Sequence, residues 1–131
     1  FGSCKQKKTM SAGEIIAKDI YSTSWKLSEW YIEGNKIKII GDKSYTLFFN
    51  SENNQIHGNS GCNRYFGKYE LNGVTLKARD IAGTMMACSP EIMNLESQFR
   101  HILETGANLS IEKRELIMEN DKNKLIFIAD K

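Results

Sequence analysis

Short runs in which apolar and polar residues alternate fill most of this chain. A period of two places alternate side chains on opposite faces, so each run predicts a strand with one buried face. These runs fall at residues 24–32, 36–40, 45–49, 65–71, 74–78, 109–111, 116–118 and 125–127. Residues 80–87 are short, apolar and interrupted by a glycine, which is consistent with a further strand or two. Between two of the runs, Asn72-Gly73 predicts a hairpin with a type I′ turn.

One segment changes to the helical period. Its apolar residues recur three or four positions apart and form a single stripe, made of Ile92, Leu95, Phe99, Ile102 and Leu103. Ser89 can cap such a helix and Pro90 fits its first turn, while Gly106 is suited to ending it. Glu91 and Glu96 lie toward its positive end, which the helix dipole favours. The pattern predicts one helix over about residues 90–105.

The order of these elements predicts a mainly β (α+β) fold. Short turns can join only antiparallel neighbours, because parallel strands need long crossovers, and no helix alternates with the strands. We therefore expect a curved, barrel-like antiparallel sheet of about eight to ten short strands, with the one helix covering an open side and protecting strand edges.

Composition excludes several classes of protein. The 131 residues are 40% hydrophobic and 26% charged, which is ordinary for a single globular domain. The formal charge is +2, and three lysines near the start account for more than all of it, so the remainder is close to neutral. Nucleic acid is therefore not an expected partner. No apolar run is long enough to span a membrane.

The first residues carry a possible processing signal. Phe-Gly-Ser at residues 1–3 precedes Cys4, and an apolar residue and two small residues before a cysteine resemble the end of a bacterial lipoprotein signal. We expect lipidation of Cys4, which would make the membrane a partner of the protein through this anchor. Residues 1–21 are then a tether and N-terminal segment, and residues 22–131 form the domain. The alternative is a plain terminal segment with an unmodified thiol.

Two stretches carry a family resemblance. Residues 58–69 read Gly-Asn-Ser-Gly-Cys-Asn-Arg-Tyr-Phe-Gly-Lys-Tyr, and residues 84–88 read Thr-Met-Met-Ala-Cys. Both resemble motifs of META domains, the HslJ-like heat-shock lipoprotein family, and Trp25, Glu96 and Phe99 resemble other elements of that family in the same order. Where the family usually has an arginine before Met-Ala-Cys, this chain has Met85, and its proline comes one place later, at Pro90.

The resemblance implies a β structure with one helix and a place in the bacterial cell envelope, facing the periplasm. It also implies a role in heat or antibiotic tolerance, and it brings no established enzymatic activity and no cofactor. The leading expectation is thus a non-catalytic binding or stress-protective module with an unidentified protein or small-molecule partner. An alternative is a carrier that holds an apolar small molecule between sheet and helix, which would need a dry, aromatic-lined pocket.

Cys62 and Cys88 are the sharpest candidates for chemistry. In an oxidising envelope they are expected to form a disulfide, although two buried thiols would also suit the sequence. A thiol enzyme using Cys62 or Cys88 is the catalytic alternative, with His57 or His101 as its base, but no signature ties a histidine to either cysteine. Two histidines and two distant cysteines make a poor metal set, so no metal is expected.

The remaining polar candidates lie beside Cys62. Glycine and asparagine tolerate positive φ, so residues 58–63 predict a tight turn that delivers Cys62 toward Cys88. Asn63 and Arg64 are the candidate recognition groups, because an amide and a guanidinium can each hold a polar ligand.

Overall fold

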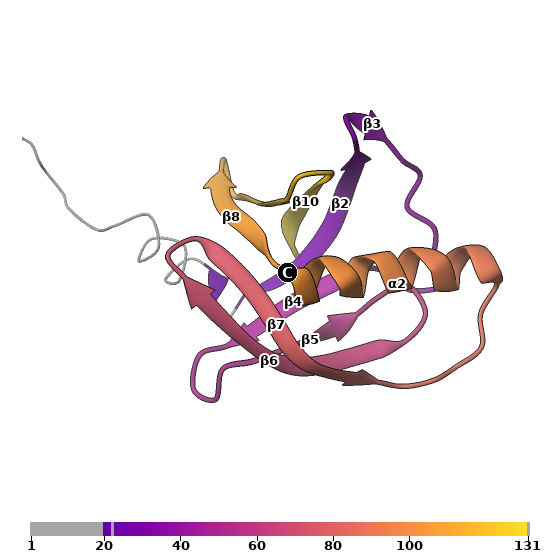
Figure 1. The fold of residues 1–131 in the computed structure, drawn as a ribbon, viewed down its shortest axis with the longest axis horizontal. Coiled ribbons are helices and arrows are strands. Elements are labelled where there is room, and N and C mark those ends of the chain that lie inside the picture. The colour runs from indigo at the N-terminus through magenta and orange to yellow at the C-terminus, as the bar shows by residue number, and fades with distance from the viewer. Residues whose placement is uncertain (1–19, 22, 131) are drawn as a thin grey trace, which may run out of the picture.

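The computed structural model of the protein describes residues 20–21 and 23–130 (Figure 1). One helix, α2 (Pro90–Thr105), lies between β7 and β8 in the chain. The strands are β2 (Ser24–Ile32), β3 (Asn35–Lys36), β4 (Thr46–Asn50), β5 (Gln55–Asn59), β6 (Arg64–Asn72), β7 (Thr75–Gly83), β8 (Ala107–Glu112), β9 (Glu115–Glu119) and β10 (Asn123–Asp130). The helix predicted at about 90–105 is confirmed.

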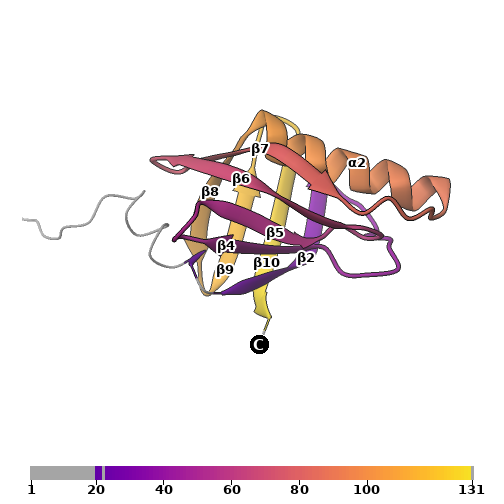
Figure 2. The same ribbon diagram turned by 90° about the horizontal axis from the view of Figure 1, so that it is seen from below.

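The nine strands form one antiparallel sheet that bends back on itself. Their order is β10-β9-β8-β7-β6-β5-β4-β2-β3, and an additional pairing of β10 with β2 closes the ring. The junction of β7 with β8 is the narrowest in this ring, with only two residue pairs. Helix α2 runs beside β7 in this part of the ring, as the two views in Figures 1 and 2 show. The predicted curved antiparallel sheet with a covering helix is therefore confirmed, as a ring-like sheet and not a true barrel.

Local signals set both ends of α2. The Ile92 N–H donates to Ser89 Oγ at 3.4 Å, and Pro90 occupies the first turn. At the other end Gly106 adopts a φ of +104° and donates its N–H to Ile102 O. Both predicted caps are present, and no helix in the described part of the chain has the length and apolarity needed to cross a membrane.

The interior of the ring is filled by aromatic side chains. Phe99 projects from α2 and is fully buried. Four rings surround it with centroids 5.3–6.4 Å away, those of Trp30, Tyr45, Tyr65 and Phe127. Edge-on packing of this kind adds to the stabilisation from burial alone. The helix is thus fastened to the sheet through its centre, which fixes the positions of its other buried residues.

Three local predictions were wrong in detail. The strand predicted at 36–40 ends at Lys36. The Ile37 N–H still donates to Trp30 O on β2, and beyond it the chain turns away from β2. The strand predicted within 80–87 ends at Gly83. The hairpin between β6 and β7 was predicted to turn at Asn72-Gly73 with type I′ geometry. Asn72 instead pairs with Thr75, so the turn residues are Gly73 and Val74. Only Gly73 has a positive φ, as in a type II′ turn.

The hairpin between β8 and β9 offers a direct test of backbone strain. Its two turn residues, Lys113 and Arg114, have φ values of +50° and +70° although neither is glycine. Replacing both in one variant, Lys113→Asn with Arg114→Gly, is expected to raise the free energy of unfolding by about 1 kcal/mol, because Asn-Gly accepts this turn at less cost. Urea denaturation measures the change, and a variant no more stable than the parent would contradict the assignment of strain.

Candidate functional site

The turn between β5 and β6 is shaped by a glycine that lies against a tyrosine ring. The Ser60 N–H donates to Asn63 O at 2.9 Å, and Gly61 between them has a φ of +91°. A Cβ on Gly61 would lie 2.5 Å from Cζ of Tyr45, so no larger residue fits without movement. The predicted tight turn is present, and it faces Cys62 inward, where that residue is 1% exposed.

Cys62 and Cys88 form the predicted disulfide. Their Cα atoms lie 6.4 Å apart, and the bond joins the turn to the segment that leads into α2. Cys88 is the more exposed partner, and its Sγ lies 3.6 Å from the Asp42 carboxylate. The two cysteines are 26 positions apart in the sequence, so the bond links segments that are distant along the chain.

A buried carboxylate holds the same turn from the helix side. Glu96 on α2 is only 5% exposed, and its Oε2 accepts from Ser60 Oγ at 2.7 Å and from the Asn63 N–H at 2.8 Å. Its Oε1 accepts from Asn63 Nδ2 at 3.0 Å. Buried charges are tolerated where several donors satisfy them, as here.

Asn63 extends these bonds to the segment after β7. Its Oδ1 accepts from the Met86 N–H at 2.7 Å and from Thr84 Oγ1 at 2.9 Å. We call Ser60, Asn63, Thr84 and Glu96 the Glu96 clasp. The clasp connects the β5–β6 turn with the segment 84–88 and with α2, and the disulfide joins the first two of these parts.

Glu96 is charged in the folded protein near neutral pH. Burial opposes the ionised form and acts to raise its pKa, but the bonds from Ser60 and Asn63 and the charge of Arg100 outweigh it. The pKa of the Glu96 carboxyl is therefore lowered. Because both carboxylate oxygens already accept hydrogen bonds, Glu96 is suited to holding the loop and poorly suited to acting as a general base.

The structure separates the other sequence candidates. Asn63 is 6% exposed and its amide is used inside the clasp, whereas Arg64 is exposed and, within the described residues, its guanidinium forms no ion pair. His57 stacks on Phe48 with centroids 5.0 Å apart, and neither it nor His101 hydrogen-bonds to a sulfur of the disulfide within those residues. Cys4 lies outside the described residues.

Glu96 and Thr84 are the residues of this site that sequence reasoning missed. Glu96 was assigned to the helix dipole, but it lies directly after Leu95 and three positions before Phe99, within the apolar stripe. A carboxylate on a buried helix face requires hydrogen-bond donors from another element. The position of Glu96 within the apolar stripe was therefore the signal that could have identified it. Thr84 was noted only as the first residue of the family-like stretch 84–88, and its residue type gave no sign of the bond to Asn63.

Two hollows of the surface are lined mainly by polar residues. An open groove of about 800 Å³ lies between the C-terminal half of α2 and the β9–β10 turn, and its lining includes Gln98, His101, Asn120 and Asp121. A second, of about 480 Å³, lies on the other side of that turn. Neither is the dry aromatic pocket that an apolar carrier would need. The described residues include no group of three or more side chains placed to hold a metal.

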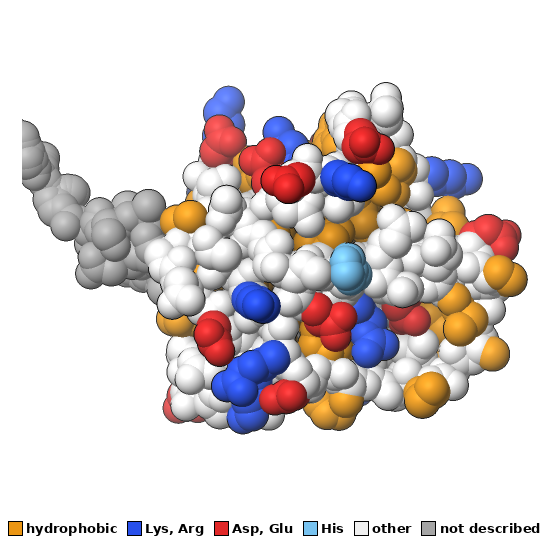
Figure 3. Space-filling model, in the orientation of Figure 1, with side chains coloured by type: hydrophobic (Ala, Val, Ile, Leu, Met, Phe, Trp, Pro, Cys, Tyr) orange, Lys and Arg blue, Asp and Glu red, His pale blue; other side chains and the backbone are white. Residues whose placement is uncertain are grey.

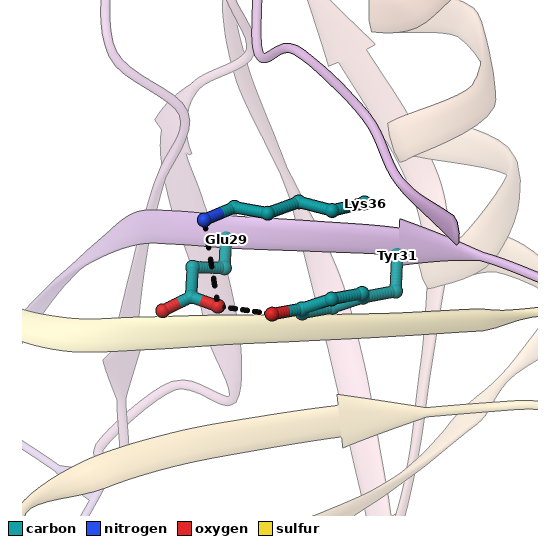
Figure 4. A network of polar contacts seen from close by, with 3 residues as sticks. All are labelled: Glu29, Tyr31 and Lys36. Carbon is teal, nitrogen blue, oxygen red and sulfur yellow. Dashed lines mark hydrogen bonds and ion pairs between the residues drawn. The ribbon is translucent and has the colours of Figure 1, made fainter. Parts of the chain in front are cut away.

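Two further features of the surface lie outside the larger groove. Beside the smaller one, Tyr31 Oη donates to Glu29 Oε1 and Lys36 Nζ lies 4.0 Å from the same oxygen (Figure 4). The bond to Glu29 is the main reason that the pKa of Tyr31 is raised, with partial dehydration and the carboxylate's charge adding to it. In Figure 3 apolar side chains gather toward the end where α2 begins. Met85, in the place of the family's usual arginine, is 96% exposed.

Comparison with known proteins assigns the family. The family model described as META domain matches residues 18–131. The chain belongs to the META domain family. The family resemblance of the two cysteine motifs is thereby confirmed over nearly the whole chain. A search of curated proteins gave no match for this META domain.

Solved structures show the same fold for this META domain. One is an NMR structure of a protein from Burkholderia xenovorans, with a TM-score of 0.75 and 21% identity, over 100% of this chain and 97% of the other. A second NMR structure has a TM-score of 0.66 and 22% identity, over 91% of this chain and 95% of the other. At such identities the likeness concerns the fold alone.

Proposed function

We propose that this META domain is a non-catalytic module of the bacterial envelope, which binds or protects a partner under heat or antibiotic stress. The observation that carries the proposal is the disulfide between Cys62 and Cys88. Disulfides persist in oxidising compartments and are rare in the cytosol, so this bond favours a periplasmic or secreted location.

The polar groups of the Glu96 clasp support a structural site more than a catalytic one. The thiols are joined, the carboxylate accepts three hydrogen bonds, and the Asn63 amide contacts three other residues. A thiol enzyme would need a histidine within reach of a free cysteine. The same residues instead hold a turn rigid, which suits a domain that presents a fixed surface.

A lipid on Cys4 is proposed to hold the domain at the membrane. We expect the intact mass of the native protein to show a lipid modification on Cys4, and membrane fractions to contain the protein. Cys4→Ser should release the protein into the soluble periplasmic fraction, whereas Ser11→Ala, seven positions further along the chain, should leave it at the membrane. An unmodified Cys4 in the native protein would overturn the anchor.

The protective role is tested in cells. A strain that lacks this protein should survive heat or novobiocin less well than its parent, and the wild-type chain should restore survival. The Cys4→Ser variant should restore it less well if position at the membrane matters. Equal survival of the deletion strain and its parent under both stresses would contradict the proposal.

A further inference from the structure

An aromatic row crosses the outer face of strands β4, β5 and β6. Phe48 pairs with His57, and His57 pairs with Phe66, so the three rings stand side by side on neighbouring strands. The residues next to them along the strands, Leu47 and Tyr65, are buried, which directs the row outward. These strands run side by side in Figure 2. Phe66 is 54% exposed, an unusual position for so large an apolar side chain.

Basic residues flank this row. Arg64 and Lys68 lie two positions to either side of Phe66 on β6, and both are exposed. The outer side of β2, β6 and β7 carries five exposed bases against two exposed acids, namely Lys26, Arg64, Lys68, Lys77 and Arg79 against Glu70 and Asp80. Only Arg79 among the five forms ion pairs, with Glu70 and Asp80, within the described residues. The remaining bases therefore present positive charge to solvent.

We propose that this face binds an anionic polysaccharide whose sugars carry carboxylate groups. One face of a sugar ring is lined by C–H groups, which suit the negative face of an aromatic ring such as Phe66. Arg64 and Lys68 lie on the same strand as Phe66, two residues to either side of it. Carboxylates of the neighbouring sugars can therefore reach these two bases. The aromatic residues at the centre of this face thus suit the C–H face of the sugar, and the bases around them suit its carboxylate.

Single-stranded nucleic acid is the competing occupant, and the geometry favours it less. Platforms for single strands offer successive free rings, one for each stacked base. Here Phe48 and His57 stack on each other with planes 29° apart and Phe66 is 54% exposed, so the row does not offer three successive free rings.

Binding to polygalacturonate, a simple polyuronate, tests the proposal on the full chain by isothermal titration calorimetry at low salt. The wild type should bind it and should not bind neutral dextran. Phe66→Ala should weaken binding about ten-fold, and Lys68→Gln about three-fold. The matched controls Ile128→Ala and Lys124→Gln, on β10, should bind as the wild type does.

Three further measurements test the same interaction. Phe66→Tyr should retain binding, and thermal unfolding should show that Phe66→Ala remains folded, since its side chain is exposed. Binding should fall as salt rises, because exposed charges are screened. Absence of polygalacturonate binding, equal binding to dextran, equal loss in the control variants, or tighter binding to a thymidine oligonucleotide would each overturn the proposal.

Discussion

Replacing Glu96 with alanine is expected to lower the free energy of unfolding by about 4 kcal/mol. The substitution removes the acceptor for Ser60 Oγ, for the Asn63 N–H and for Asn63 Nδ2. These donors lie in a buried place, so water does not readily replace the carboxylate, and each unsatisfied donor is costly. Urea denaturation of the oxidised protein measures the loss.

The same helix supplies the control for this variant. Glu104 lies on α2 and is exposed, so Glu104→Ala should change stability by no more than about 0.5 kcal/mol. Glu96→Gln should fall between the two, because its oxygen can still accept while its amide N–H groups face other donors. Equal stability of Glu96→Ala and Glu104→Ala would contradict the role given to the clasp.

The charge of Glu96 also predicts a pH dependence. Its pKa is lower in the folded protein than in the unfolded chain, so unfolding takes up a proton at acid pH. The stabilisation from its charge is fully present above the unfolded pKa of about 4.3 and is lost as pH falls through the lower, folded value. The stability difference between wild type and Glu96→Gln should therefore be constant near neutral pH and shrink below about pH 4.

Removing the disulfide is expected to cost about 3.5 kcal/mol, as chain entropy predicts for a loop of this length. The bond joins residues 26 positions apart, and in the unfolded chain it restrains the segment that contains β6 and β7. The double variant Cys62→Ala with Cys88→Ala should therefore unfold at a lower urea concentration than the oxidised parent. It should still fold, because the Glu96 clasp and the aromatic interior remain.

Reductant provides the control for the disulfide variant. Both proteins are best compared in a Cys4→Ser background, which removes the third thiol. Dithiothreitol should destabilise the parent by a similar amount and leave the double variant unchanged. A parent whose stability does not respond to reduction, although both thiols become titratable, would show that the bond contributes little.

The elements of the fold were predictable where signals are local. The helix was placed correctly because Ser89, Pro90 and Gly106 mark its ends, and because its apolar stripe has a helical period. The strand predicted at 36–40 failed although it alternates, because after Lys36 the chain leaves β2 and Ile40 O accepts from Tyr45 Oη instead. Alternation of apolar and polar residues shows which segments could have one buried face. Whether such a segment forms a strand depends on pairing with other strands, which are distant in the sequence.

The candidate site was predictable in part for the same reason. The cysteines stand out by residue type, and the glycine-rich turn shows where the backbone needs freedom. The contact of Gly61 with the Tyr45 ring and the bonds from Ser60 and Asn63 to Glu96 join segments up to 36 residues apart. No rule of sequence spacing predicts such contacts. A glutamate within an apolar stripe nevertheless indicates that it has a buried hydrogen-bond donor as its partner.

The pKa of Glu96 tests the central claim most directly, because that claim is that a charged, buried carboxylate holds the Cys62 turn against α2. It can be measured by NMR from the side-chain carboxyl carbon of Glu96 as pH is varied. The account predicts a pKa below the usual value of about 4.3, and a rise toward or above that value when the Ser60 and Asn63 donors are removed in Ser60→Ala and Asn63→Ala. A Glu96 pKa at or above the usual value in the wild-type protein would contradict it.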